Sequence, residues 1–184
     1  MFSCNTFSKP SISNKVEVFL NNISVLVSDF CQIMPSGQVY TGKFWLSRTK
    51  KHNNVKILYI SGIKQVIFIE DSSVRVTDLD TKKQQTCTLP QDSMYKILSG
   101  KLDLTKEKVE IIENSKKRLR IKLLKSTVFG GGDVTLIFSK YPQTGNIKCL
   151  EGWIIDDQIL FSFDPDTMTV NDPSKLNPKV FDPD

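Results

Sequence analysis

From residue 30 onward, apolar and polar residues alternate with a period of two, in short runs that turn residues separate. Successive side chains of a β-strand point to opposite faces, so this period predicts strands. The stretch 38–48 is the clearest case, because one of its faces would carry Tyr40, Gly42, Phe44, Leu46 and Arg48. Consecutive short strands joined by short turns are typical of an antiparallel meander. The pattern therefore predicts a mainly β fold, either a barrel or a strongly curved sheet.

The same period divides most of the chain into expected strands. They are 38–48, 55–60, 64–70, 73–79, 84–89, 109–113, 118–125, 133–139, 146–156 and 159–170. No internal repeat or linker interrupts them, so the whole chain, 1–184, is expected to be one domain. The proline-containing tail 171–184 is expected to be an extended surface segment.

Two helices are expected in addition to the strands. Apolar residues at helical spacing predict a helix over 14–29, with Asn14 as its N-cap. A short helix over 93–99 should end at Gly100. The first helix has a wide apolar face, which implies packing on a large hydrophobic surface. Residues 1–13, rich in Ser, Asn and Pro, would form a loose arm in front of it.

A sheet of about ten strands in a chain this short must curl, and its concave side collects one face of every strand. The large apolar candidates for that concave face are Phe44, Leu46, Phe68, Val74, Val76, Leu119, Ile121, Leu123, Phe138, Phe161 and Phe163. Periodicity leaves two interpretations open. Helices either fill the concavity as an ordinary core, or they leave a space for an apolar ligand.

Arg48 continues the apolar face of the strand over 38–48. A guanidinium that points where apolar residues point is costly to bury unless it is hydrogen-bonded or paired. Two roles would satisfy this requirement. Arg48 could anchor backbone carbonyls at the rim of the barrel, or it could hold a helical lid against the sheet. The alternation does not decide between them.

The net charge of the chain and the distribution of its lysines indicate which partners it could bind. The net charge is +5 and the sequence pI about 9.0, which suits nucleic acid, an anionic lipid or an acidic partner. The lysines are scattered, and the densest groups, 50–51 and 116–118 with Arg120, resemble hairpin ends. No aromatic residues are interleaved with them, as a face that binds single-stranded nucleic acid requires. We therefore expect no nucleic-acid partner.

Catalytic and metal-binding patterns are weak. His52 is the only histidine, so it is the only residue that could serve as the histidine of a Ser-His-Asp or Cys-His catalytic site. Gly130–Gly132 is not followed by the Lys and Ser/Thr of a phosphate-binding loop. The cysteines have no metal-ligand spacing and form either disulfides or free thiols; they are Cys4, Cys31, Cys87 and Cys149. We expect no enzyme activity, no cofactor and no metal.

Targeting is not readable from the N-terminus. Met1–Ser13 lacks the basic start and the apolar run of a secretory signal. A removed signal peptide and an intracellular protein both fit this N-terminus. No stretch reaches the roughly 18 apolar residues that a membrane-spanning helix needs.

Several short motifs, taken in order, resemble one family. Gly42–Arg48 (GKFWLSR) is similar to the G-x-[FL]-W-[LV]-x-R strand of LolA-type lipoprotein carriers. Upstream, Phe30–Gln32 resembles the family's F-x-Q. Trp153–Asp156 resembles the W-x-[VI]-x-D strand of its alphaproteobacterial branch, and Asn177–Phe181 resembles that branch's closing segment. The resemblance covers about 16–183. The chain departs from the family at Thr49, where proline is common.

The resemblance implies a LolA/LolB-like fold, an incomplete, strongly curved antiparallel β-barrel of about eleven strands with a helical lid. It implies a periplasmic carrier that binds the acyl chains of lipoproteins in an apolar cavity and moves them from the inner to the outer membrane. The expected partners are acylated lipoproteins, an inner-membrane ABC lipoprotein-releasing transporter and, where one exists, an outer-membrane acceptor.

The resemblance also assigns roles to residues. Phe19, Leu20 and Ile23 of the first helix would form the lid, and Arg48 would hold it closed. The concave-face residues would line the cavity. We expect a monomer. The alternatives are a binder of free lipid or another hydrophobic small molecule, and a structural module with a filled barrel.

Overall fold

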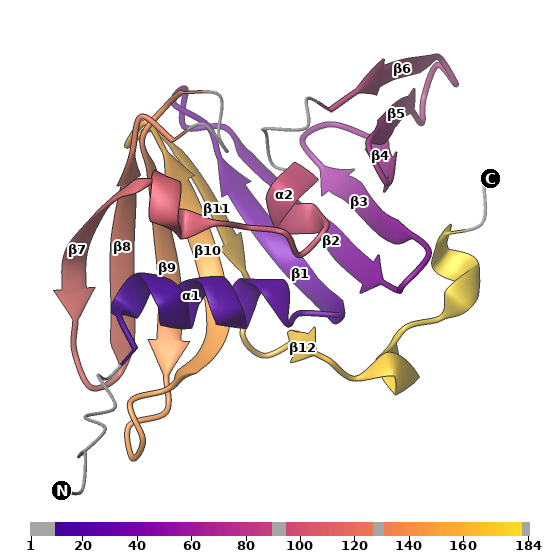
Figure 1. Cartoon of the computed structure of the whole chain (residues 1–184). Coiled ribbons are helices and arrows are strands. Elements are labelled where there is room, and N and C mark those ends of the chain that lie inside the picture. The colour runs from indigo at the N-terminus through magenta and orange to yellow at the C-terminus, as the bar shows by residue number, and fades with distance from the viewer. Residues whose placement is uncertain (1–9, 90–94, 127–130, 182–184) are drawn as a thin grey trace, which may run out of the picture.

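The computed structural model describes residues 10–89, 95–126 and 131–181, and over these it forms a single antiparallel sheet (Figure 1). The strands follow the order β6-β5-β4-β3-β2-β1-β11-β10-β9-β8-β7, and the short β12 also pairs with β1. Their bounds are β1 Val25–Ile33, β2 Val39–Arg48, β3 Asn53–Ser61, β4 Gln65–Glu70, β5 Ser73–Asp78, β6 Gln84–Thr88, β7 Lys108–Asn114, β8 Arg118–Leu124, β9 Val134–Lys140, β10 Ile147–Ile155, β11 Ile159–Phe163 and β12 Thr169–Val170. Helix α1 spans Ile12–Asn21 and helix α2 spans Tyr95–Leu98.

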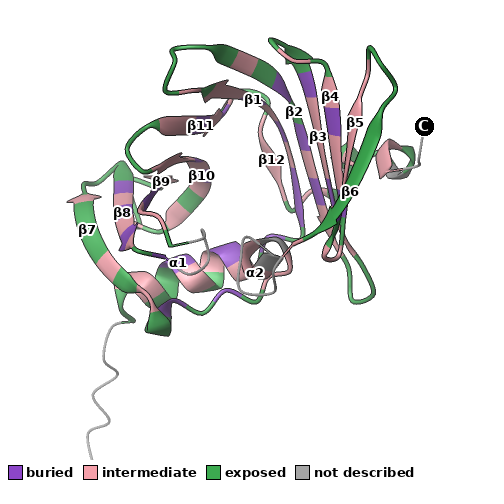
Figure 2. Ribbon diagram, turned by 90° about the horizontal axis from the view of Figure 1, so that it is seen from above, coloured by how far each residue is buried: buried purple, intermediate pink, exposed green. Residues whose placement is uncertain are grey.

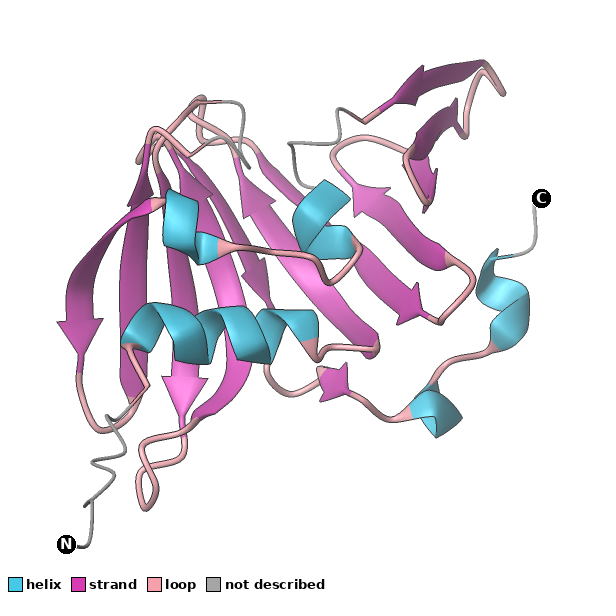
Figure 3. Cartoon of the chain, in the orientation of Figure 1, coloured by secondary structure: helices cyan, strands magenta, loops and turns pink. Residues whose placement is uncertain are grey.

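The sheet curls without closing, because β6 and β7 are its two free edges. Figure 2 looks into the curve from above, with α1 and α2 lying across the opening between those edges. Figure 3 shows the same division, with strands forming the wall and helices on its open side. The mainly β, incomplete-barrel fold predicted above is confirmed.

The first helix is shorter than predicted. α1 ends at Asn21 and β1 begins at Val25, so the prediction of a helix over 14–29 is wrong in its second half. The N-cap is Ser11, whose Oγ accepts a hydrogen bond from the Asn14 amide at 3.1 Å. β1 lies inside the sheet and pairs with β2 on one side and with β11 and β12 on the other. This hydrogen bonding along both edges outweighs the helical spacing of its apolar residues.

The C-terminal part also differs from the prediction. The single strand expected over 159–170 is two strands, because the chain turns at Asp164 between β11 and β12. The tail is not fully extended, since short 3₁₀ helices occupy Pro173–Lys175 and Pro178–Phe181. The second of these 3₁₀ helices contacts β3. The tail therefore packs on the outside of the sheet.

Parts of four predictions lie outside the described residues. They are 1–9 of the expected arm, 93–94 of the expected second helix, Gly130 of the expected glycine loop and 182–184 of the expected tail. The described part of the second helix, α2, is followed by Gly100 at a φ of +68°. A left-handed glycine just beyond a helix end is the stop that the sequence predicted.

The core fills the concave side of the sheet, where α1 packs on β9 and β10. Phe138 in β9 is 0% exposed, and its ring meets that of Phe19 edge-on with centroids 5.9 Å apart. Gly42 in β2 allows a close approach of two strands. A Cβ at that position would lie 2.0 Å from the Leu58 carbonyl oxygen and 2.8 Å from a ring carbon of Phe30. Any side chain at Gly42 would force the sheet apart.

Phe68 does not lie on the concave face, so that prediction is wrong. Its neighbour Ile69 in β4 belongs to the core, and adjacent residues of a strand face opposite sides. On the outer face, the Arg75 guanidinium lies 5.1 Å from the centre of the Phe68 ring. The Phe181 ring of the C-terminal segment is 6.4 Å from it. Since β4 is apolar on both faces, alternation alone could not separate them.

Candidate apolar binding cavity

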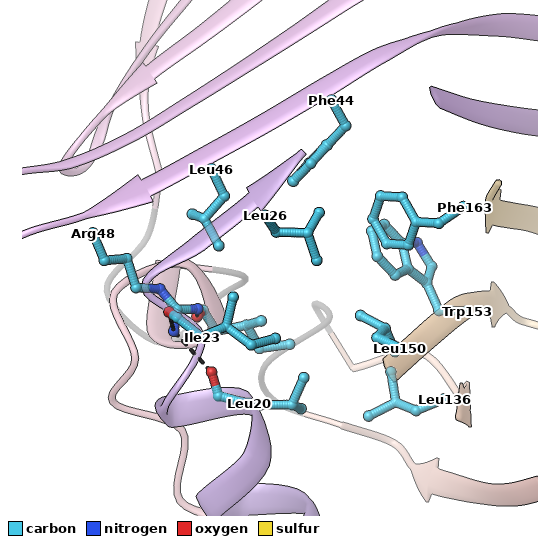
Figure 4. A pocket seen from close by; sticks show the side chains of 11 residues that line it. Leu20, Ile23, Leu26, Phe44, Leu46, Arg48, Leu136, Leu150, Trp153 and Phe163 are labelled. Atoms are coloured by element: carbon cyan, nitrogen blue, oxygen red, sulfur yellow. Dashed lines mark hydrogen bonds between the residues drawn. The ribbon is translucent and has the colours of Figure 1, made fainter. Parts of the chain in front are cut away.

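A small cavity lies between the helices and the concave wall (Figure 4). Its volume is about 50 Å³, far below the roughly 300–1,000 Å³ of pockets that hold small-molecule ligands. Ten of its eleven lining residues are apolar, and the other is Arg48. The lining residues are Leu20, Ile23, Leu26, Phe44, Leu46, Arg48, Ile97, Leu136, Leu150, Trp153 and Phe163. α1, α2 and the core side chains therefore leave little free space on the concave side of the sheet.

The structure brings together part of the predicted site. The predicted residues that line this cavity are Leu20, Ile23, Phe44, Leu46, Arg48 and Phe163. Other predicted residues face the core without lining the cavity; they are Phe19, Val74, Val76, Leu119, Ile121, Leu123, Phe138 and Phe161. Five lining residues were not predicted, namely Leu26, Ile97, Leu136, Leu150 and Trp153. Three of the five could have been found from the sequence, because Leu136, Leu150 and Trp153 all fall in expected strands.

Stacked aromatic rings form one wall of this region. The Trp153 and Phe161 rings are parallel with centroids 4.4 Å apart, and Phe161 stacks on Phe30 at 4.7 Å. Phe30 then meets Tyr59 edge-on at 5.1 Å, across the space that Gly42 leaves free. Stacked and edge-on pairs of this kind add to the energy of burial. Of these four rings only Trp153 lines the cavity, and the stack continues from it into the core.

Arg48 joins the sheet to both helices. Its Nη1 donates to the carbonyl oxygens of Leu20 and Ile23, each at 2.7 Å, at the C-terminal end of α1. Its Nη2 donates to the carbonyl of Ile97 in α2. Helix C-termini have unsatisfied carbonyls and a partial negative charge, which a guanidinium neutralises. The position of Arg48 at the end of β2 thus connects three elements through main-chain acceptors.

Burial lowers the pKa of the Arg48 side chain but leaves it charged. Loss of solvation lowers the pKa of its guanidinium to about 10. The group therefore stays protonated at neutral pH and keeps its donors. A charged group on a largely apolar cavity wall is stable here because carbonyl oxygens surround it.

Further polar contacts join α1 to the segment that follows α2. The Asn21 side chain pairs with the main chain of Leu102, donating to its carbonyl and accepting from its amide, both at 2.9 Å. Glu17 accepts a hydrogen bond from the Leu104 amide at 2.8 Å. We call α1, α2 and residues 99–104 the lid. These hydrogen bonds join the parts of the lid to one another.

Asn171 holds the turn between α1 and β1. Its Oδ1 accepts from the main-chain amides of Ser24 at 2.6 Å and Val25 at 3.3 Å, and its side-chain amide donates to the Asn22 carbonyl at 3.0 Å. Asn171 has a φ of +57°, a left-handed conformation that asparagine tolerates better than most residues. The C-terminal segment therefore holds the connection between α1 and β1 in place.

We predict that Asn171→Ala lowers the free energy of unfolding by about 2 kcal/mol, because several hydrogen bonds to the main chain are lost and alanine is strained at this φ. Urea unfolding measures the loss. Asn171→Gly removes the same hydrogen bonds but tolerates the φ, so it should cost less than alanine. Equal stability of all three proteins would contradict the role of this side chain.

The described residues show no sign of a metal site, a disulfide or a membrane-spanning helix. Among them no cluster of three His, Cys, Asp or Glu could hold a metal ion. Cys31, Cys87 and Cys149 are free thiols, and Cys4 lies outside the described residues. None of the helices in residues 10–89, 95–126 and 131–181 is long and apolar enough to cross a membrane.

Comparison with known proteins identifies the fold. No protein-family model matches the chain. No curated protein matches it in sequence. Among solved structures it resembles MucB of Pseudomonas aeruginosa in the MucA/MucB complex, with a TM-score of 0.56 and 10% identity. That match covers 93% of this chain and 59% of that chain.

A second MucB structure, in complex with the periplasmic part of MucA, gives a TM-score of 0.55 at 8% identity, with 95% of this chain and 60% of that chain covered. MucB alone gives 0.50 at 11% identity, with 86% and 57% covered. The chain thus spans less than two thirds of the length of these MucB chains. MucB has a LolA-like fold, and at this identity the likeness shows the fold alone.

Proposed function

We propose that this protein is a carrier that shields the acyl chains of lipoproteins in its concave cavity and performs no chemistry. One observation carries the proposal. An apolar cavity is closed by a lid, and the lid is held by hydrogen bonds from Arg48 to main-chain carbonyls. Such hydrogen bonds can break without removing apolar packing elsewhere, so the space can open while the sheet stays folded.

The energies are compatible with binding that can be reversed. Each buried methylene contributes about 0.8 kcal/mol, so the several acyl chains of a lipoprotein together would bind too tightly to be released from a preformed cavity. Opening the lid costs hydrogen bonds and apolar contacts between α1 and the sheet. This cost offsets part of the gain and brings the net affinity into a range that permits transfer.

The setting we propose follows from the carrier role. The protein would work in the periplasm, receive lipoproteins from an inner-membrane ABC transporter and deliver them to the outer membrane. Two of the similar MucB structures were solved with the protein MucA, so this fold accommodates protein partners. That precedent supports contacts with a transporter and an acceptor in addition to the acyl chain.

If acyl chains bind in the cavity, the fluorescence of Trp153 should change selectively on binding. The chain has two tryptophans, and only Trp153 lines the cavity, since Trp45 alternates with Phe44 and Leu46 and faces outward. In a Trp45→Phe variant, a fatty acid brominated along its chain should quench most of the remaining emission, because bromine would contact the Trp153 indole. Titration of the quenching should saturate at one site.

The matched control is Trp153→Phe, which keeps only Trp45. Its emission should change little with the same brominated fatty acid. Equal quenching of both variants would indicate non-specific association and contradict binding in the cavity. Saturable quenching of Trp153 by fatty acid, without any transfer of lipoproteins, would instead favour the alternative function of a free-lipid binder.

A further inference from the structure

The turns at one end of β7–β10 carry a concentrated positive charge that the cavity does not explain. Residues 114–118 form the β7–β8 turn with its flanks, and residues 139–149 form the β9–β10 turn with its flanks. Together they contain five cations and no Asp or Glu, namely Lys116, Lys117, Arg118, Lys140 and Lys148. Figure 1 shows both turns at the same end of the sheet, below α1.

Hydrogen bonds hold these two turns side by side. The Lys140 ammonium donates to the Asn114 Oδ1 and to the Ser115 carbonyl oxygen, each at 2.8 Å. The Lys140 amide donates to the Lys117 carbonyl oxygen at 2.8 Å. The two turns thus form one continuous surface, which we call the basic end.

Most of the charge at the basic end is not neutralised. Lys116, Lys117 and Lys148 make no ion pair with any described residue. Arg118 pairs with Glu151 at 3.2 Å but remains half exposed. At the other end of the same strands the charges are paired, since Lys122 lies 3.4 Å from Asp133 and 2.8 Å from Asp157.

An exposed aromatic residue and a helix face extend the basic end. Tyr141 follows Lys140 and is 48% exposed. A groove next to the β9–β10 turn is lined on its far side by Lys15 and Val18 of α1, and Val18 is also 48% exposed. Tyrosine, lysine and single apolar side chains together are the composition that anchors proteins at the headgroup level of a bilayer.

We propose that the basic end docks the protein onto the surface of a membrane that contains anionic phospholipid. Unpaired lysines next to an exposed tyrosine match a negatively charged headgroup layer, and clusters of four or more cations bind such layers. Docking would place α1, and with it the lid, beside the bilayer. The inference does not depend on what the cavity holds.

Vesicle binding tests the proposal with the full chain. The protein should co-sediment with vesicles of phosphatidylcholine and phosphatidylglycerol, should not co-sediment with pure phosphatidylcholine, and should dissociate as salt is added. The variant Lys116→Gln/Lys117→Gln/Lys148→Gln should lose roughly 100-fold in partition coefficient, from about fivefold for each lysine. Tyr141→Ser should lower it by several-fold.

The control is Lys83→Gln/Lys106→Gln/Lys179→Gln, which removes the same charge from exposed lysines elsewhere. It should bind anionic vesicles nearly as well as the unaltered protein, and thermal unfolding should show that both triple variants remain folded. Equal binding of the two triple variants, or equal binding to neutral vesicles, would overturn the proposal. Binding to polyglutamate without binding to vesicles would assign the basic end to an acidic protein and overturn it equally.

Discussion

In an Arg48→Leu variant, the amide hydrogens of α1 and α2 should exchange with solvent about 100-fold faster than in the unaltered protein. Leucine keeps apolar contact with the cavity but donates no hydrogen bond to the carbonyls of Leu20, Ile23 and Ile97. Hydrogen bonds from charged groups contribute about 1.5–3 kcal/mol each, but leucine also avoids the cost of burying a guanidinium, so the cost of opening the lid falls by a net value of about 3 kcal/mol. Hydrogen exchange followed by mass spectrometry measures the change.

Arg75→Leu is the matched control, because Arg75 lies on the outer face against Phe68 and does not contact the lid. It should leave exchange in α1 and α2 unchanged. Amides of β1 and β2 should exchange at the same rate in all three proteins. If Arg48→Leu left lid exchange unaltered, or if the sheet unfolded with the lid, the role of Arg48 as a separable lid contact would be refuted.

Phe138→Ala should destabilise the protein by about 3–5 kcal/mol. The ring of Phe138 is fully buried and meets Phe19 of α1, so truncation leaves a void that its neighbours fill only in part. This loss is a large share of the stability of an ordinary domain. Urea unfolding, with an unchanged dependence on denaturant, measures the difference.

Phe68→Ala makes the same chemical change on the outer face. It should cost only about 1–2 kcal/mol, because it removes a half-buried ring and its contact with Arg75. The pair of variants therefore tests which face of the sheet is the core. A larger cost for Phe68→Ala than for Phe138→Ala would contradict the assignment of the two faces.

Strands could be located from the sequence where only one face is apolar. In β8, Leu119, Ile121 and Leu123 alternate with cations, and all three are buried as expected. β1 could not be recognised, because it is paired on both edges and its apolar residues fit helical spacing equally well. The end of α1 depends on contacts from Asn171, about 150 residues away in the chain, which no local pattern contains.

The cavity was predicted less completely than the fold. Arg48 was recognisable, since a charged residue on an apolar face requires acceptors, but which carbonyls accept from it depends on tertiary packing. Whether an inward-facing residue lines the cavity or packs in the core depends on the position of α1. Phe163 lines it and Phe161 does not, although both are buried on β11. Periodicity carries no information on that difference.

The carrier function is tested most directly by release of lipoproteins. Purified protein is added to spheroplasts that retain newly made lipoproteins in the inner membrane, and the supernatant is examined for complexes. We expect lipoprotein to appear in solution as a one-to-one complex with this protein. Absence of any released lipoprotein, while brominated fatty acid still quenches Trp153, would contradict the carrier function and leave a binder of free lipid.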